Sequence, residues 1–149
     1  MNAVERFAEL PKLAAADQDL RRRGRFLTVE CRIDIGSVPF FLSIREGALT
    51  ACERGPKLMR STAFSYRAGD EAWTNHWKAV PDPGWHDLLA LTKRGAASIE
   101  VTLRDRTRFV AKVLGTDPQD DIALLGLAGA PDGLPVLPLG DSEIGRAHV

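Results

Sequence analysis

A strict alternation of apolar and polar side chains between residues 27 and 44 constrains the fold of this chain more than any other feature. From residue 27 to residue 35 the odd positions are all apolar, and the even positions are Thr, Glu, Arg and Asp. After the turn residues Gly36 and Ser37, the alternation resumes with Val38, Phe40, Leu42 and Ile44. Because successive side chains of a strand point to opposite faces, both segments are predicted to be half-buried antiparallel strands.

Further strands and several short helices are expected around this pair. Residues 48–53 predict a third strand, and Phe64, Tyr66 and Ala68 mark a fourth. Residues 4–20 carry a helical pattern that Pro11 should interrupt. Asp70 is a suitable N-terminal cap for a helix, and residues 85–92 predict another short helix that Gly95 ends.

The segment 98–104 also alternates, with Ile99, Val101 and Leu103 in one phase. We interpret it as a junction between two unlike regions. Beyond it, residues 101–115 predict a β-hairpin, residues 121–127 a short strand, and residues 134–142 an extended segment limited by prolines. The predicted fold class is therefore α+β: an antiparallel strand meander with flanking short helices, followed by an incomplete β-barrel fragment with exposed strand edges.

Composition excludes several classes of function. The 149 residues have a formal net charge of zero, which gives no general attraction to nucleic acid. No apolar run approaches a membrane span, and residues 1–6 lack the pattern of a secretory signal, so we expect a cytoplasmic protein. Cys31 and Cys52 fit no metal spacing and are expected to be reduced. No cofactor or metal site is expected.

Bulky apolar residues on the two later helices are the main candidates for a binding site. They are Trp73, Trp77, Trp85, Leu88 and Leu89. One interpretation is that they fill the core between helix and sheet; the other is that they line a cavity for an apolar small molecule. No catalytic group accompanies them. His86 and Asp87 are adjacent and point apart on a helix, and His76 has no second ligand-type neighbour.

The order of these features over residues 26–100 resembles the sterol-carrier-protein (type two) lipid-transfer superfamily. The resemblance rests on residues 71–77 and 81–100, which follow a strand meander. It implies a tunnel for fatty acyl chains or sterols, in which the candidate side chains face Phe40, Leu42 and Ile44. In the superfamily a last helix closes the tunnel. After Glu100 this chain lacks that helix.

Residues 101–142 instead resemble the first barrel of HtrA/Deg-type trypsin-like serine proteases. The matching strings are Val-Thr-Leu at 101–103, Phe-Val-Ala-Lys-Val at 109–113, Asp-Ile-Ala-Leu-Leu at 121–125 and Leu-Pro-Val-Leu-Pro-Leu-Gly-Asp-Ser at 134–142, with Arg106 in a usual glycine position. The resemblance implies that Asp121 corresponds to the triad acid, which orients the catalytic histidine.

The remaining parts of a protease active site are not matched. Thr74, Asn75 and His76 mimic the string around the triad histidine, but they lie farther upstream than the family spacing allows. Ser142 lacks the glycines that follow a nucleophile. We therefore expect no enzyme activity.

The last six residues, 144–149, form the peptide that the sequencing-adapter string ATCGGAAGAGCACACGTC encodes, and our hypothesis is that they are adapter read-through rather than an ordinary flexible tail. The predicted organisation is then a sterol-carrier-like domain at 1–100, a protease fragment at 101–143 and an artefactual tail at 144–149. The function expected is binding of an apolar small molecule. Two alternatives remain: a trypsin-like endopeptidase fragment that contributes only Asp121, and an interaction domain that uses the basic residues 21–25.

Overall fold

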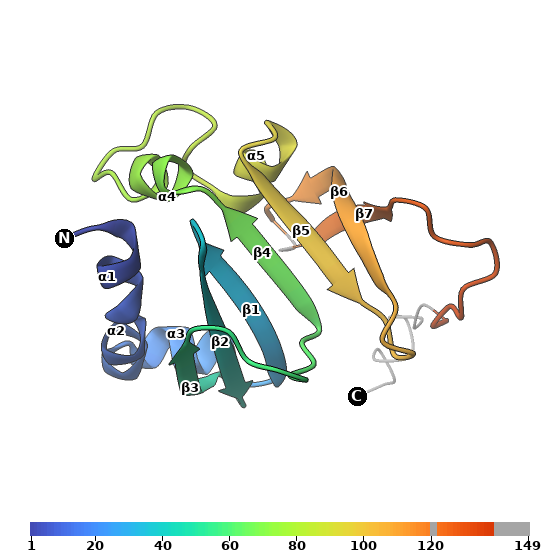
Figure 1. The fold of residues 1–149 in the computed structure, drawn as a ribbon, viewed down its shortest axis with the longest axis horizontal. Helices are drawn as coiled ribbons and strands as arrows, with labels where there is room; N and C mark the ends of the chain where they lie inside the picture. The colour runs from blue at the N-terminus through green and yellow to red at the C-terminus, as the bar shows by residue number, and fades with distance from the viewer. Residues whose placement is uncertain (120–121, 139–149) are drawn as a thin grey trace, which may run out of the picture.

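The computed structural model describes residues 1–119 and 122–138. Within these ranges the helices and strands alternate in blocks along the chain (Figure 1). They are α1 (Ala3–Ala8), α2 (Leu10–Ala16), α3 (Gln18–Arg23), β1 (Val29–Ile35), β2 (Val38–Arg45), β3 (Ala48–Arg54), β4 (Phe64–Ala68), α4 (Asp70–His76), α5 (Leu88–Lys93), β5 (Ala97–Thr102), β6 (Arg108–Asp117) and β7 (Ile122–Leu127). The predicted α+β class is confirmed.

The seven strands of the described residues belong to one open sheet, in the order β3-β2-β1-β4-β5-β6-β7. Neighbouring strands are antiparallel except β1 and β4, which run parallel. The β1–β2–β3 meander therefore lies on one side of β1, and the chain crosses to the other side to add β4. This crossover brings side chains of β1 next to those of β4 and β5, an arrangement that a simple meander would not produce.

The three N-terminal helices are separated by local capping interactions. Asn2 and Glu5 form a capping box at the start of α1, in which each side chain accepts from the backbone N–H of the other residue at 2.9 Å. Pro11 lies in the first turn of α2, where its missing N–H costs nothing, and Asp17 caps α3. The predicted interruption at Pro11 is thus confirmed as a new helix start.

The basic residues of segment 21–25 lie at the end of α3. Arg21, Arg22 and Arg23 occupy its last turn, where positive charge interacts favourably with the terminal carbonyl groups of the helix. Gly24 follows as the C-cap. The turn residue Gly47 lies directly beside this end, since a Cβ on it would approach the Arg21 carbonyl oxygen to 2.5 Å. The basic segment therefore ends a helix that packs against the β2–β3 turn.

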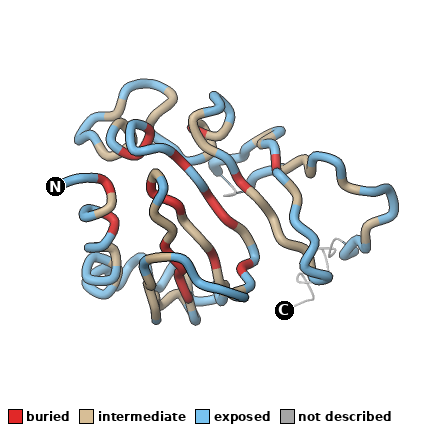
Figure 2. The backbone as a smooth tube through the Cα atoms, in the orientation of Figure 1, coloured by how far each residue is buried: buried red, intermediate tan, exposed pale blue. Residues whose placement is uncertain are grey.

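The core lies on the sheet face that the helices cover. Phe40, Leu42, Tyr66 and Ile99 project from the sheet strands into one cluster with Phe7 of α1 and Trp73 of α4. Figure 2 shows buried segments along β1, β2 and β4, whereas β7 is exposed or half-buried. The helices thus cover the first part of the sheet more completely than the last.

The predicted junction lies inside a regular strand. Ile99 pairs with Tyr66 of β4 on one side and with Ala111 of β6 on the other. Val101 likewise pairs with Phe64 and Phe109. Residues on both sides of the junction therefore belong to β5, which is hydrogen-bonded to β4 on one side and to β6 on the other. The division into segments 1–100 and 101–143 stays a prediction.

Element boundaries differ from expectation by a few residues. Gly69, not Asp70, is the N-cap of α4, and Asp70 occupies its first turn. Helix α5 begins only at Leu88, because the Asp87 carboxylate caps it by accepting from the N–H groups of Leu89 and Ala90.

Within the described residues, no helix has the length and apolar character needed to cross a membrane. Residues 139–149, including the segment assigned to adapter read-through, lie outside the described residues.

Candidate functional site

An aromatic cluster joins α1, α4 and β2 at the centre of the candidate apolar site. The Phe7 ring lies 4.8 Å from the ring of Phe40, 6.2 Å from that of Trp73 and 6.3 Å from that of Trp77, measured between centroids. The rings of Trp73 and Trp77 are 5.1 Å apart. Phe7 therefore fills the space between the α4 tryptophans and the sheet.

Trp73 is fixed at the bottom of this cluster. Its side chain is 3% exposed, and the indole Nε1–H donates to the backbone carbonyl of Asp34 at 3.0 Å. The ring also contacts Tyr66 edge-on at 5.6 Å. A buried indole needs such a partner for its N–H, so this position is specified by both shape and hydrogen bonding.

A second group of candidate residues lies around α5. The Tyr66 hydroxyl donates to the backbone carbonyl of Leu88 at 2.8 Å, and burial of the phenol raises the pKa of Tyr66 to about 12. The His76 Nδ1 atom is 2.8 Å from the carbonyl oxygen of Trp85, which ties the end of α4 to the loop before α5. The guanidinium of Arg94 lies 4.1 Å from the centroid of the Trp85 ring.

The structure places the predicted ligand-binding residues in three settings. Phe40, Leu42 and Trp73 are buried in the core cluster. Trp77, Trp85 and Leu89 are partly buried and pack against its margin, and Leu88 is 38% exposed. Ile44 is half-buried beyond an irregularity in the β2–β3 ladder after Ser43. Phe7 and Tyr66, which join these settings, were not among the predicted site residues, although Phe7 lies in the helical pattern predicted over residues 4–20.

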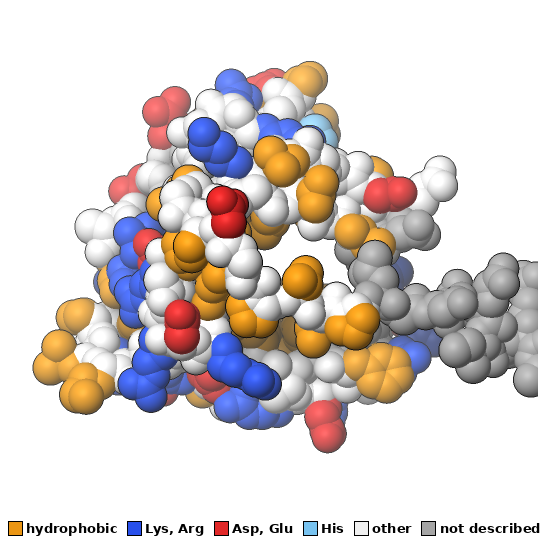
Figure 3. Space-filling model, turned by 90° about the vertical axis from the view of Figure 1, so that its right-hand side faces the viewer, with side chains coloured by type: hydrophobic (Ala, Val, Ile, Leu, Met, Phe, Trp, Pro, Cys, Tyr) orange, Lys and Arg blue, Asp and Glu red, His pale blue; other side chains and the backbone are white. Residues whose placement is uncertain are grey.

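The same sheet face continues past α5 without a covering helix among the described residues. Half-buried apolar side chains extend the core across the later strands, and they are Phe64, Val101, Val113, Leu125 and Leu127. Figure 3, which faces the β6–β7 side, shows a hollow bordered by hydrophobic side chains. An apolar surface continuous with the core is thus partly open on this side.

The residues considered for catalysis do not form a site in the described part of the chain. Asp121 lies outside the described residues, as does Ser142. His76 ends α4, and one of its ring nitrogens contacts the Trp85 carbonyl. Burial raises the pKa of the Cys31 thiol to about 11, which keeps it protonated near neutral pH. The described residues contain no group of His, Cys, Asp or Glu side chains suited to hold a metal ion.

Comparison with known proteins gives partial similarities. No family model matches the sequence. The DegP-like periplasmic serine endoprotease of Marinomonas sp. (strain MWYL1) is 45% identical over 62 residues, which cover 39% of this chain and 13% of the relative. The corresponding protein of Pseudomonas putida (strain GB-1) is 50% identical over 48 residues, or 32% of this chain and 10% of the relative. The chain therefore spans only about a tenth of the length of these relatives.

A solved structure also resembles part of the fold. The solution structure of a conserved hypothetical protein from Thermus thermophilus, described as a candidate sterol carrier protein, aligns with a TM-score of 0.45 and 14% sequence identity. The alignment covers 59% of this chain and 63% of the other.

Proposed function

We propose that this protein binds an apolar small molecule, of the fatty acyl or sterol-like class, between its α4–α5 tryptophans and the sheet. In this proposal the binding region lacks the helix that would close it and is joined to a catalytically incomplete fragment of a DegP-like serine protease. The protein carries its ligand without chemical change and acts in the cytoplasm.

The observation that carries the proposal is the position of Phe7. Its ring lies between Phe40 of β2, Trp73 of α4 and Trp77 at the C-cap of α4, in the space where we expect the ligand. Phe7 belongs to a separate helix of six residues. An apolar tail that replaced this ring would find the same aromatic walls, and each Å² of apolar surface it buried would contribute about 25 cal/mol.

The open sheet face supports a path to this space. Phe64 and Val101 continue the core surface away from α4, and Trp85 and Leu89 pack against the core cluster. A ligand longer than one aromatic ring could extend along this surface. Its polar end would then remain in water at the β6–β7 side (Figure 3).

Titration with a fluorescent fatty acid tests the proposal on the full chain. We expect Phe7→Ala to tighten binding by about tenfold, because it vacates the space that the tail must enter. Trp77→Ala should weaken binding by a similar factor by removing one wall. Phe26→Ala is the matched control, since Phe26 is 85% exposed and should leave the affinity unchanged. Equal affinity in all three variants and the wild type would disprove a site at the aromatic cluster.

A second candidate function follows from the sequence identity with DegP-like proteases. In this proposal the later part of the chain contributes Asp121 as a triad acid to an active site that is completed elsewhere. A triad acid only orients the imidazole and stabilises its protonated form, so it hydrolyses nothing without a nucleophile and a base.

A serine-reactive fluorophosphonate probe separates the two functions. We expect no labelling of the purified chain. Covalent labelling that disappears in Ser142→Ala, while Ser98→Ala still reacts, would establish a nucleophile and overturn the non-catalytic proposal. Ser98 is an exposed serine on β5 and serves as the control.

A further inference from the structure

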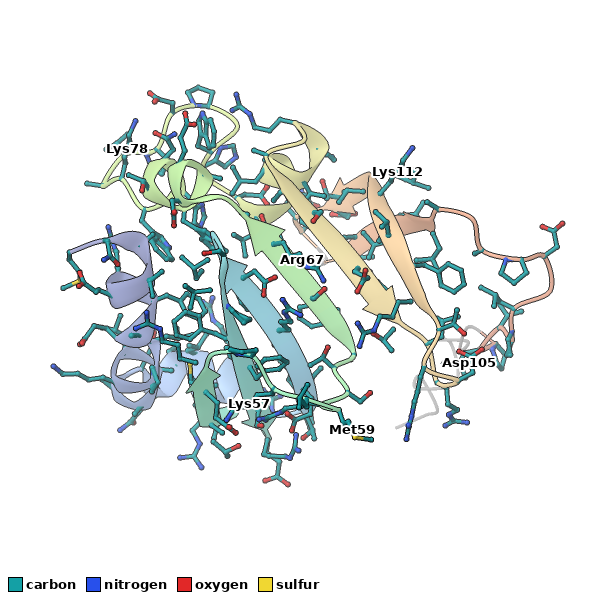
Figure 4. All side chains as sticks on the ribbon, in the orientation of Figure 1. Lys57, Met59, Arg67, Lys78, Asp105 and Lys112 are labelled. Carbon is teal, nitrogen blue, oxygen red and sulfur yellow. The ribbon has the colours of Figure 1, made fainter. Side chains whose placement is uncertain are left out.

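The sheet face opposite the helices carries a concentration of cationic side chains. Along β4, Phe64 and Tyr66 point into the core, so Ser65 and Arg67 point to the other face. Arg32 of β1 is directly opposite Ser65, and Glu100 of β5 is its partner on the other side. Figure 4 shows Arg67 over the middle of the sheet, with Lys57 and Met59 near the loop before β4.

A cavity of about 390 Å³ lies on this face, and we name it the arginine pocket. Its lining combines six cationic side chains with a single carboxylate, that of Glu100. The cations are Arg32, Lys57, Arg60, Arg67, Arg106 and Arg108. The volume lies within the range of small-molecule sites, and the charge favours an anion.

Neighbouring carboxylates pair with five of the six cations. Glu53 lies 2.7 Å from Lys57 and 2.6 Å from Arg60, and Glu30 lies 3.0 Å from Arg60. Arg32 and Arg67 share Asp34, with Nε–Oδ distances of 2.7 Å and 3.3 Å. Glu100 contacts Arg67 and Arg108 only at 3.9 Å. In the described ranges no carboxylate forms an ion pair with Arg106. Positive charge therefore remains available on the side of the pocket that the β5–β6 turn provides.

An unpaired hydroxyl on the pocket floor points to a ligand as well. Ser65 is 5% exposed, and its Oγ has no hydrogen-bond partner among the described residues. Buried polar groups are nearly always paired, and an unpaired one costs free energy. The Ser65 Oγ is itself closed to solvent, so an oxygen-rich anion supplies the acceptor that this hydroxyl lacks only after neighbouring side chains move apart.

We propose that the arginine pocket binds the phosphate group of a small molecule. Guanidinium groups offer forked pairs of N–H donors that match phosphate oxygens, and several such groups converge here. The Phe41 ring lies 5.7 Å from the guanidinium carbons of both Arg32 and Arg60. The Ser65 and Thr62 hydroxyls complete a set of donors suited to an anion with several oxygens.

This site is independent of the proposed apolar site, because it lies on the opposite face of the sheet. Arg32, Arg60 and Arg67 come from strands and loops before the predicted junction, whereas Arg106 and Arg108 come from after it. Phosphate binding therefore requires the two segments to pack together as the sheet shows.

Calorimetric titration of the full chain with pyrophosphate at constant ionic strength tests the proposal. We expect saturable binding that weakens about tenfold in Arg106→Gly and a few-fold in Ser65→Ala. Neither change should impair folding, because Arg106 has the positive backbone angle φ of 70° that glycine adopts freely and Ser65→Ala removes an unpaired hydroxyl. Lys112→Gln removes one charge from β6 outside the pocket and should bind like the wild type.

A vesicle arm identifies the source of the phosphate. Vesicles of phosphatidylcholine with phosphatidic acid should compete poorly with pyrophosphate, because a phosphate fixed in a bilayer cannot reach the pocket floor. Absence of saturable pyrophosphate binding, or equal weakening by Lys112→Gln and Arg106→Gly, would overturn the proposal. Vesicle binding without pyrophosphate binding would overturn it too, since the cations would then form only a surface patch.

Discussion

The two ends of the sheet both carry apolar side chains but differ in what covers them. In β1, β2 and β4 the inward apolar residues meet α1 and α4, and Phe40, Tyr66 and Trp73 are almost fully buried. In β6 and β7 the inward residues Val113, Leu125 and Leu127 are only partly buried, and the further apolar residues Leu114, Ile122 and Leu124 are each more than 60% exposed. An alternating sequence thus specifies a strand, while burial of its apolar face depends on helices that other parts of the chain must supply.

The largest expected effect contrasts a buried tryptophan with an exposed leucine. Trp73→Ala should lower the free energy of unfolding by about 3–5 kcal/mol, because it leaves a cavity and removes the bond to the Asp34 carbonyl. Leu124→Ala, on β7, should change it by less than about 0.5 kcal/mol. Urea unfolding followed by circular dichroism measures both. Similar losses in the two variants would mean that β7 is packed as well as the core.

The next effect concerns the strand that joins the two ends. Ile99 is buried and pairs with both β4 and β6, so Ile99→Ala should cost about 2–4 kcal/mol. In the wild type, hydrogen exchange should show lower amide protection in β6 and β7 than in β1 and β4. In Ile99→Ala, amide protection should fall in both of these regions. The exposed neighbour provides the control variant Ser98→Ala. A loss confined to β1–β4 would favour separate folding of the segments before and after the junction.

Most strands could be predicted from the sequence because their local alternation matches their final environment. The strands at 38–44, 48–53 and around Tyr66 fall where expected, as does the hairpin beyond the junction. Helix starts were predicted less well. Asp87 and Gly69 decide where α5 and α4 begin, and such capping depends on backbone angles that composition does not reveal.

The two sites differ in how far the sequence could reveal them. The α4 tryptophans share a helical face, so their proximity follows from spacing alone. The insertion of Phe7 between them and β2 depends on how a distant helix docks. The arginine pocket was not predicted, because it requires β4 to pair with β1 rather than with β3. That parallel pairing places Arg32, Arg67 and Arg108 around one pocket although they are far apart in the chain.

A smaller effect is expected at the covered end of the sheet, where the stability of the fold depends on pH through Tyr66. Burial raises the pKa of Tyr66 from the ordinary 10.0 to about 12, so the folded protein retains a proton that the unfolded chain releases. The resulting stability, about 3 kcal/mol, is present below pH 10 and is lost as pH rises toward 12. Tyr66 is the single tyrosine of the chain, so phenolate absorbance reports it directly. Tyr66→Phe should cost about 1 kcal/mol at neutral pH and remove this part of the alkaline slope. A Tyr66 that titrates near its ordinary pKa would show that this region opens to water.

The smallest effect concerns the turn between β5 and β6, at the uncovered end. Arg106 occupies a position where the resemblance to HtrA/Deg-type proteases expects glycine, and its backbone angle φ of 70° explains that expectation. Arg106→Gly should therefore raise the free energy of unfolding by up to about 1 kcal/mol, measured by thermal melting. Asp105→Gly in the same turn should lower the free energy of unfolding, because the Asp105 carboxylate accepts from the Thr107 N–H at 2.9 Å.

The stability of Arg106→Gly can be combined with its affinity for pyrophosphate. The arginine at position 106 strains the turn, and no carboxylate of the described residues pairs with it. A gain in stability together with a loss of pyrophosphate affinity would therefore indicate that this arginine serves binding at a cost to folding. A loss of stability in Arg106→Gly would instead give the side chain a structural role and remove that interpretation.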